Sequence, residues 1–206
     1  IDRYGLKNST TMTELEDRTM TRVGGMVSAV QSGFSKKSGK PYAMLTIEDM
    51  LGTFQVLCMN DNFDRYKHLF ENTLPVLIIG EVNNAEDKAK VFPQEIMRLE
   101  DAPRRFSEQI HFRVQYKTLS SQLLADINTL VGSHFGKCPL FLCVLRDEGG
   151  PVFIETHDKF CVMPSIELEA AVESLLGEGA YHVRVDRSLP ERERRRWEKK
   201  PDGATA

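Results

Sequence analysis

The sequence predicts a chain in two parts, a five-stranded β-barrel followed by a small α+β domain. The barrel is indicated by three consecutive strands between residues 21 and 59 and by two more strands after a short helix. The α+β domain is indicated by the second half, where strands and helices alternate in the order β-α-β-β-β-α-β. We therefore expect four segments: a lead-in (1–19), the barrel (20–103), the α+β domain (104–187) and a charged tail (188–206).

The first predicted strand, residues 21–34, is long and contains two adjacent glycines. Apolar residues recur along it among small and polar ones. Gly24 and Gly25 lie inside the strand, and glycines in such a position often mark a bulge or a sharp bend. We expect the strand to bend there, as the wall of a small barrel requires.

The next two strands, 42–49 and 53–59, alternate with a period of two, so each has one buried and one exposed face. The turn between them is Asp49–Gly52. One face carries Ala43, Leu45, Ile47, Phe54, Val56 and Cys58. The other face carries Tyr42, Met44, Thr46, Glu48, Thr53, Gln55 and Leu57.

The barrel is completed by a helix over 60–70, an apolar strand over 74–82 and a fifth strand over 88–99. Pro93 lies inside the fifth strand, and we expect it to break the strand or to place it at an edge. A long bent strand followed by a tight hairpin is typical of the start of a small five-stranded barrel.

The second half begins after a predicted boundary at residues 101–105. Its predicted strands are 110–116, 138–145, 152–156, 160–163 and 181–185. One helix covers 119–131 and ends at Gly132; the other begins with Ser165 as its N-cap and runs to residue 176. From residue 188 the chain is charged, and the segment around Trp197 is either a solubilising tail or a docking element.

The charge distribution is more informative than the net charge of -3. Residues 18–47 contain five bases and no acid, and they cover the first strand and the following hairpin loop. A local positive stripe is what contact with phosphates requires. The alternative is a solvated loop that is basic without binding anything. The five bases are Arg18, Arg22, Lys36, Lys37 and Lys40.

The sequence shows no catalytic or metal-binding pattern. The sequence contains no Walker A or GxGxxG loop for nucleotides, no GxSxG motif of hydrolases, no HExxH motif and no histidine pair at the spacing of metal ligands. The acids Glu48 and Asp49 are expected to shape the turn before Gly52 rather than to bind magnesium. We therefore expect a binding module without cofactor or metal, not an enzyme.

The four cysteines form no CxxC pair, which favours free thiols in a reducing compartment. No apolar run reaches the length of about 18 residues that suggests a membrane span. These features predict a cytoplasmic protein without a membrane partner. Because the chain opens with Ile1, we expect it to be a piece of a longer protein.

One spacing pattern in the barrel resembles the OB-fold of nucleic-acid-binding proteins, in which the strand 2–3 face and the loops bind oligonucleotides. The pattern consists of Gly39, Lys40, Leu45, Asp49, Gly52, Gln55 and Val56. Together with the later segments IHFRV and FCVMPSIELEAAVESLLG, it makes residues 13–187 similar to the C-terminal region of the bacterial DNA polymerase III alpha subunit.

This resemblance implies an OB domain that binds single-stranded template DNA and a last domain that binds the clamp-loader tau subunit. The rest of the polymerase chain would be a further partner and would hold the DNA-directed DNA polymerase, a nucleotidyltransferase. An anticodon-binding or helicase-associated OB domain is one alternative, and an OB scaffold used only for protein interaction is another. The candidate contact residues are Arg22, Phe34, Lys36, Lys37, Lys40, Tyr42, Met44, Gln55, Lys88 and Lys90.

Overall fold

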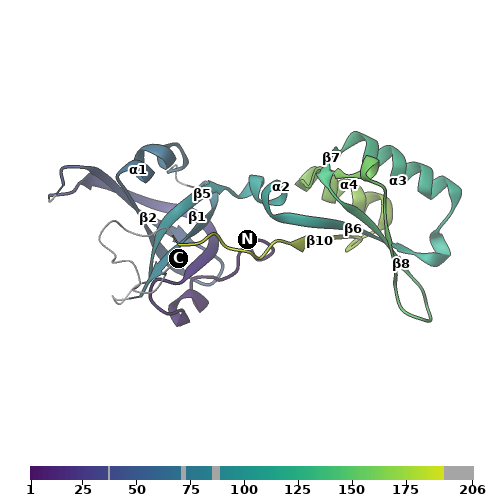
Figure 1. The fold of residues 1–206 in the computed structure, drawn as a ribbon, viewed down its shortest axis with the longest axis horizontal. Helices are drawn as coiled ribbons and strands as arrows, with labels where there is room; N and C mark the ends of the chain where they lie inside the picture. Colours follow the sequence, from purple (N-terminus) through teal and green to yellow (C-terminus); the bar gives the residue numbers. More distant parts are fainter. Residues whose placement is uncertain (37, 71–72, 85–88, 193–206) are drawn as a thin grey trace, which may run out of the picture. The chain divides into compact units, whose positions relative to one another are not determined.

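The structure is a computed structural model that describes residues 1–36, 38–70, 73–84 and 89–192. It divides into two compact units, which are described separately (Figure 1). The barrel unit comprises Gly5–Ile96 and the described residues from Leu189 onward. The sheet unit comprises Ile1–Tyr4 and Met97–Ser188.

The barrel unit is a closed five-stranded barrel, as the sequence predicts, with the strand order β1-β2-β3-β5-β4. Between β3 and β4 lie α1 (Asp61–Tyr66) and a 3-10 turn (Lys67–Leu69), where a longer helix is predicted. The strands are β1 (Met20–Phe34), β2 (Pro41–Glu48), β3 (Thr53–Met59), β4 (Pro75–Asn83) and β5 (Lys90–Arg98).

Strand β1 closes the barrel by pairing with two partners. Its first half pairs with β4 and its second half with β2, and the change of partner occurs at Met26. A Cβ atom on Gly25 would lie 2.5 Å from Cγ2 of Ile47 and 2.6 Å from the carbonyl oxygen of Glu48. The irregularity in pairing lies between Val27 and Ala29. The expected bulge is thus displaced from the glycine pair, and Gly25 is needed for close approach to β2.

The fifth strand corrects the prediction made for Pro93. Strand β5 continues through this residue and lies between β3 and β4 in the closed barrel. The parallel pairing of β5 with β3 involves Lys90 and Val91, so Pro93 lies beyond it. Gly80 of β4 allows the backbone of β5 to approach β4 closely, because a Cβ atom on Gly80 would collide with the carbonyl oxygen of Phe92. The missing N–H of Pro93 is therefore tolerated inside the barrel wall.

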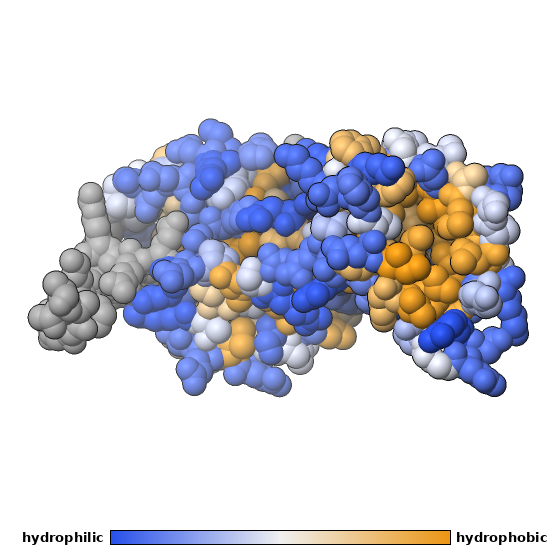
Figure 2. All heavy atoms as spheres, turned by 45° about the vertical axis from the view of Figure 1, so that its right-hand side comes forward, coloured by the Kyte–Doolittle hydropathy of each residue, from blue (hydrophilic) through white to orange (hydrophobic). Residues whose placement is uncertain are grey.

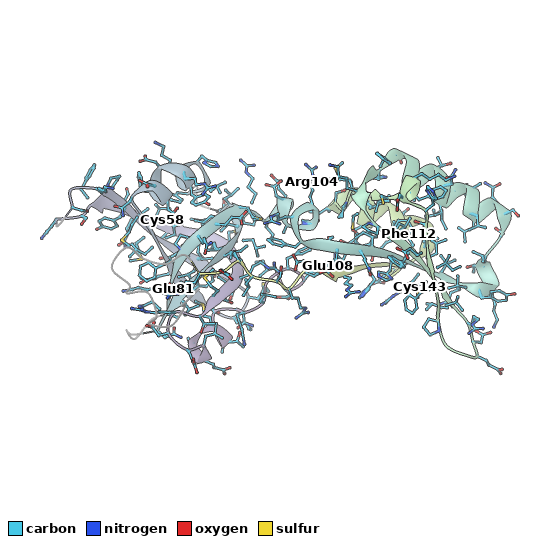
Figure 3. The ribbon with its side chains drawn as sticks, viewed as in Figure 1. Cys58, Glu81, Arg104, Glu108, Phe112 and Cys143 are labelled. Carbon is cyan, nitrogen blue, oxygen red and sulfur yellow. The ribbon has the colours of Figure 1, made fainter. Side chains whose placement is uncertain are left out.

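Apolar side chains from all five strands fill the barrel. Met12, from a 3-10 turn at Thr11–Glu14, adds a side chain with no exposed surface. Fully burying such a side chain stabilises the fold by roughly 1.5–3 kcal/mol. Cys58, marked in Figure 3, belongs to this core, and burial raises the pKa of its thiol to about 12. The core includes Val23, Val27, Leu45, Ile47, Phe54, Val56, Val76, Ile78, Val91 and Ile96.

The sheet unit contains a four-stranded sheet in the order β10-β6-β8-β9. Strand β6 is parallel to β8, and the other two pairs are antiparallel. The strands are β6 (Ser107–Gln115), β7 (Phe135–Cys138), β8 (Leu140–Leu145), β9 (Val152–Glu155) and β10 (Tyr181–Val185). The helices are α2 (Ala102–Phe106), α3 (Ser121–Ser133) and α4 (Ile166–Leu176).

The element order β-α-β-β-β-α-β is as predicted, but its middle strands differ. The predicted strand 138–145 is divided into β7 and β8. The predicted strand 160–163 is wrong: Asp158–Phe160 form a 3-10 turn, and Val162 makes only isolated bridges. Gly132 lies inside α3 rather than ending it.

The predicted domain boundary also lies elsewhere in the structure. The units divide between Ile96 and Met97, seven residues before the predicted start at 104. The first residues of the lead-in belong to the sheet unit, because Arg3 forms two hydrogen bonds of 2.7 Å with the Glu169 carboxylate on α4. Tyr4 is buried in the same unit.

The two long helices lie on one side of the sheet (Figure 1). Buried side chains of β6 and β8 face the two helices. Each helix begins at a serine that caps its N-terminus. The hydroxyl of Ser120 accepts a hydrogen bond from the N–H of Leu123, and that of Ser165 accepts one from Leu168, both at 3.1 Å. The Ser165 cap is thus as predicted. The buried residues include Ile110, Phe112, Val114, Leu140, Val144, Ile127, Val131, Leu168 and Val172.

Removing the Ser165 cap will destabilise the sheet unit. We expect Ser165→Ala to lower its free energy of unfolding by about 1 kcal/mol, because the Leu168 N–H loses its acceptor. Urea unfolding followed by the circular dichroism of the helices measures this. Ser165→Asp, which restores an acceptor oxygen, should recover most of the loss; equal loss in both variants would show that the cap contributes nothing.

Candidate nucleic-acid interface

The outward face of β2 and β3 forms a continuous strip of side chains. The register places Tyr42 opposite Met59, Met44 opposite Leu57, and Thr46 opposite Gln55. All six are half-buried or exposed, whereas the inward residues of the two strands are at most 3% exposed. The two faces predicted from the alternation are therefore confirmed. We call these six residues the strip.

Strand β1 extends the strip toward the β1–β2 loop. Gln31 lies opposite Met44, and Gly33 opposite Tyr42. Phe34 ends the strand with 74% of its surface exposed, directly opposite Pro41. Tyr42 is therefore the aromatic ring of the strip at this end, and Phe34, one residue further in register and on the alternate face of the strand, lies at the edge of the loop.

The β1–β2 loop presents lysines at that same end. Its backbone is closed by a hydrogen bond from the N–H of Ser35 to the carbonyl of Lys40 (2.9 Å), and Gly39 adopts a φ of 68°. Lys36 and Lys40 are exposed, and neither forms an ion pair within the described residues. Lys37 lies outside the described residues. The structure therefore brings two of the predicted lysines next to Phe34 and Tyr42.

A further lysine lies at the other end of the strip. Lys90 of β5 is the parallel neighbour of Gln55 on β3. Thr46 comes four positions after Tyr42 along β2, so the strip is roughly 13 Å long between its basic ends. Lys88 lies outside the described residues, so its predicted contribution stays a prediction.

Arg22 is wrong as a candidate contact residue. Its side chain has no exposed surface, because it lies in the half of β1 that pairs with β4. Its carbonyl oxygen accepts hydrogen bonds from the N–H groups of Leu6 (2.7 Å) and Lys7 (3.3 Å). The lead-in thus runs beside this part of β1. In this fold, Arg22 is a structural residue that a ligand does not reach.

The β2–β3 turn is built on the carboxylate of Asp49. It accepts hydrogen bonds from the N–H groups of Leu51 and Gly52, each 2.9 Å. It also accepts two bonds of 2.6 Å from the N–H and the hydroxyl of Ser9. Partial burial acts to raise the pKa of Asp49, but these four bonds outweigh it, and the net pKa is lowered. Asp49 therefore shapes the turn, as predicted.

Sequence reasoning missed Met59 as a member of the strip and did not anticipate the apolar tip of the turn. Met59 is 43% exposed and lies opposite Tyr42. The available signal was the tight turn between β2 and β3, because such a turn fixes the register of the two strands. Met50 and Leu51, at the tip, are 87% and 64% exposed. Thioether and aromatic side chains give the strip faces on which a base can lie.

The chemistry available on the strip is binding chemistry. Aromatic and thioether groups offer stacking, Gln55 offers hydrogen bonds, and lysines offer contacts to phosphates. Among the described residues, no group of three or more His, Cys, Asp or Glu side chains could hold a metal ion. All four cysteines are free. No helix within the described residues is long and apolar enough to cross a membrane.

Residues 21–99 match the family of OB-fold nucleic acid binding domains named tRNA_anti-codon. The barrel has the OB fold. The match runs from the second residue of β1 to the residue after β5, so it covers the strip and both of its basic ends. From here on the barrel unit is called the OB domain.

The chain is also similar to DNA polymerase III subunit alpha from several bacteria. It is 21% identical to that of Saccharopolyspora erythraea over 171 residues, which is 81% of this chain and 14% of that protein. It is 26% identical to that of Pseudomonas fluorescens over 125 residues, 60% of this chain and 11% of that protein. The chain thus spans 14% or less of the length of these two relatives.

Among solved structures, similar chains include an OBody bound to hen egg-white lysozyme, with a TM-score of 0.39 and 17% identity over 46% of this chain and 93% of that one. Another is the second OB-fold domain of replication protein A from Methanococcus maripaludis, with a TM-score of 0.34 and 17% identity over 46% of this chain and 96% of that one.

The Asp49 turn gives a testable pH dependence. A folded-state pKa below the unfolded value means that the carboxylate stabilises the fold above the unfolded pKa of about 3.9, and that this stabilisation is lost as the pH falls through the folded pKa. We expect Asp49→Asn to cost about 1 kcal/mol at neutral pH and progressively less in acid. Urea unfolding at several pH values measures both. The exposed neighbour Glu48→Gln is the control, and an equal pH response in the two variants would contradict the role of Asp49.

Proposed function

We propose that this chain is the non-catalytic C-terminal part of a replicative DNA polymerase alpha subunit, and that its OB domain binds single-stranded template DNA. The observation that carries this proposal is the placement of exposed Lys36 and Lys40 beside Phe34 and Tyr42, at one end of the strip. The similarity to DNA polymerase III alpha subunits supports the choice of DNA.

Binding to the strip would be weak and salt-dependent. Lysines that contact phosphates release counterions, so affinity falls as salt rises. Stacking on an aromatic ring contributes about 1–3 kcal/mol per base, and the strip with its adjoining loop offers two such rings, Phe34 and Tyr42. Met44 and Met59 offer flexible, polarizable apolar contacts that are less specific. Such a surface suits a strand that moves along the protein during synthesis.

The polymerase reaction itself would belong to other parts of the longer protein. This chain spans 14% or less of the two polymerase relatives described above. The acid pair at the end of β2, Glu48 and Asp49, has a structural role, because the Asp49 carboxylate accepts hydrogen bonds from Ser9, Leu51 and Gly52. The role proposed for the OB domain is therefore to position template for a catalytic centre elsewhere, without a cofactor of its own.

For the sheet unit, we propose docking to the clamp-loader tau subunit. Figure 2 shows a broad apolar area on this unit, while the barrel side of the same view is mostly hydrophilic. Leu124 on α3 and Ile154 on β9 are 43% and 47% exposed. Between α3 and the sheet lies an apolar cavity of about 240 Å³, lined by Leu124, Ile127, Leu142 and Phe160 among others. An apolar area with a cavity of this kind fits a protein partner.

An anticodon-binding OB domain is the second candidate. The matching family model carries that name, and the same face of the fold would take an RNA loop. A helicase-associated OB domain would use this face as well. A folded tRNA and a single-stranded DNA of equal charge, compared in competition, distinguish the first alternative from template binding.

The first test concerns the basic end of the strip. We expect Lys36→Ala/Lys40→Ala to weaken binding of labelled oligo(dT), and to reduce the slope of log affinity against log salt by about 1.4, since each phosphate contact on a single strand contributes about 0.7. Fluorescence anisotropy at several salt concentrations measures both quantities.

The matched control is Arg65→Ala/Lys67→Ala, which removes the same charge from exposed positions in α1 and the 3-10 turn after it, outside the strip. If the two double variants bind alike, the strip is not the binding surface. If the unchanged chain fails to bind oligo(dT) even at low salt, the barrel serves only as a scaffold. A clear preference for tRNA would favour the anticodon alternative.

The second test concerns the apolar area of the sheet unit. We expect Leu124→Ser/Ile154→Ser to abolish capture of the chain by immobilised clamp-loader tau subunit. Both changes replace an exposed apolar side chain with a polar one, so the bound tau subunit would lose two apolar contacts. Met50→Ser/Leu51→Ser, which makes two comparable apolar-to-serine changes at exposed positions of the OB domain, should leave capture unchanged. Equal capture of all three chains would remove the tau assignment from this surface.

A further inference from the structure

The face of the sheet opposite α3 and α4 carries a row of aromatic rings. The register places His182 of β10, His111 of β6 and Phe141 of β8 side by side across three strands. The rings of His111 and Phe141 are stacked, with centroids 5.0 Å apart and an angle of 18° between their planes. His182 and Phe153 approach His111 edge-on, each at 5.9 Å. Four rings therefore form one connected cluster.

This cluster is accessible to a ligand. Phe153 is 59% exposed, His182 is exposed, and His111 and Phe141 are half-buried. Three of the rings, those of His111, Phe153 and His182, line a surface cavity of about 440 Å³, which is also lined by Cys143 of β8, marked in Figure 3. Since strands lie about 4.8 Å apart, the row of three rings spans roughly 10 Å, which accommodates two or three bases.

Cations border the same cavity. Arg113 lies on β6, two residues from His111, and is exposed; it forms no ion pair within the described part of the chain. Arg184 on β10 is paired with Glu108, with 3.0 Å between Nε and Oε2. An acidic residue, Glu155 of β9, lies opposite Phe141 at the end of the row of rings. Arg113 is therefore the cation that this face offers to a phosphate.

The two histidines are suited to stacking rather than to charge. Burial lowers the pKa of His111, and His182, Arg113 and Arg184 lower it further. Burial likewise lowers the pKa of His182, with Arg113 and Arg3 adding to the effect. Both imidazoles are thus neutral at neutral pH. Within the described residues, the buried Nδ1 of His111 has no hydrogen-bond partner.

From this arrangement we infer that the open face of the sheet unit is a second site for single-stranded nucleic acid, with bases stacked on the faces of His111, Phe141 and Phe153 that the cluster leaves uncovered and a phosphate held by Arg113. Exposed aromatic rings on an open four-stranded sheet take splayed bases in this way. This face differs from the OB strip in the groups that it offers: it has four clustered rings and one cation without an ion pair in the described chain, whereas the strip has one ring beside a basic loop.

A protein partner fits this face less well than a nucleic acid does. The apolar area proposed for tau includes α3 and the helix-side cavity, which lie across the sheet from His111. The open face combines neutral rings with a cation that no acid of the described chain neutralises. Bases and phosphates together satisfy both of these features. The inference stands independently of the function proposed for the OB domain.

The histidines provide a direct readout. We expect oligo(dT) of about eight nucleotides, added to the whole chain, to move the ring-proton signals of His111 and His182 upfield, because a stacked base shields them. The other three histidines, His68, His134 and His157, are internal controls that should not move. Single His→Gln variants assign the five signals.

Affinity variants test the same site. In the Lys36→Ala/Lys40→Ala background, residual binding of the oligonucleotide should fall at least about fivefold with Phe153→Ala. Arg113→Gln should reduce the salt slope by about 0.7. Phe135→Ala is the matched control, since Phe135 is 65% exposed on β7 and lines a different cavity.

Unmoved signals of His111 and His182, or equal affinities for Phe153→Ala and Phe135→Ala, would overturn the inference. So would signals that move with the tau subunit and not with DNA, which would make the face a protein interface. Loss of binding only with the OB-domain lysines would support the function proposed above while refuting this site. Binding that depends on Phe153 and not on those lysines would do the reverse.

Discussion

The change of partner along β1 is the constraint on which the OB domain depends. One strand of 15 residues must form the barrel wall with β4 and then with β2, and the change occurs at Met26. It requires the backbone of β2 to lie against Gly25, where any side chain would collide with Ile47 and Glu48. Because the second half of β1 is thereby directed along β2, the hairpin with Phe34, Lys36 and Lys40 extends from the strip rather than from the barrel end. The interface is thus a consequence of barrel closure.

Local patterns were sufficient to predict the strands that form the interface. The alternation in β2 and β3 gave the correct faces because one side of each strand is buried and the other is not, and β3 was predicted with its correct bounds. Arg22 was placed wrongly for the opposite reason. From Thr21 to Gly25 every residue of β1 is buried, since this part of the strand is covered on both sides. Burial of this part depends on contacts with the lead-in, which folds back beside β1, and with β4, and such contacts leave no periodic signal in the sequence of β1.

The errors in the sheet unit have a similar origin. Gly132 suggests a helix end, yet there is open space around it and α3 continues to Ser133. The segment 160–163 is apolar, but it turns to bring Val162 against β7 instead of joining the main sheet. The aromatic cluster was also beyond sequence reasoning, because His111, Phe141, Phe153 and His182 come from four strands whose order is not their order in the chain. The pairing of β6 with β8, together with the pairings of β10 with β6 and of β8 with β9, makes them neighbours.

A chain with a net charge of -3 binds a polyanion only if its cations act locally. At physiological salt, charges are screened beyond about 8 Å, so a phosphate near Lys36 and Lys40 is affected by these lysines much more than by the acids elsewhere on the chain. The same screening makes this contact sensitive to salt. Stacking is not screened, because the attraction between a base and a ring does not arise from net charge. As salt rises, a contact made by lysines, as proposed for the OB domain, is therefore expected to weaken before a contact made by rings, as proposed for the sheet unit.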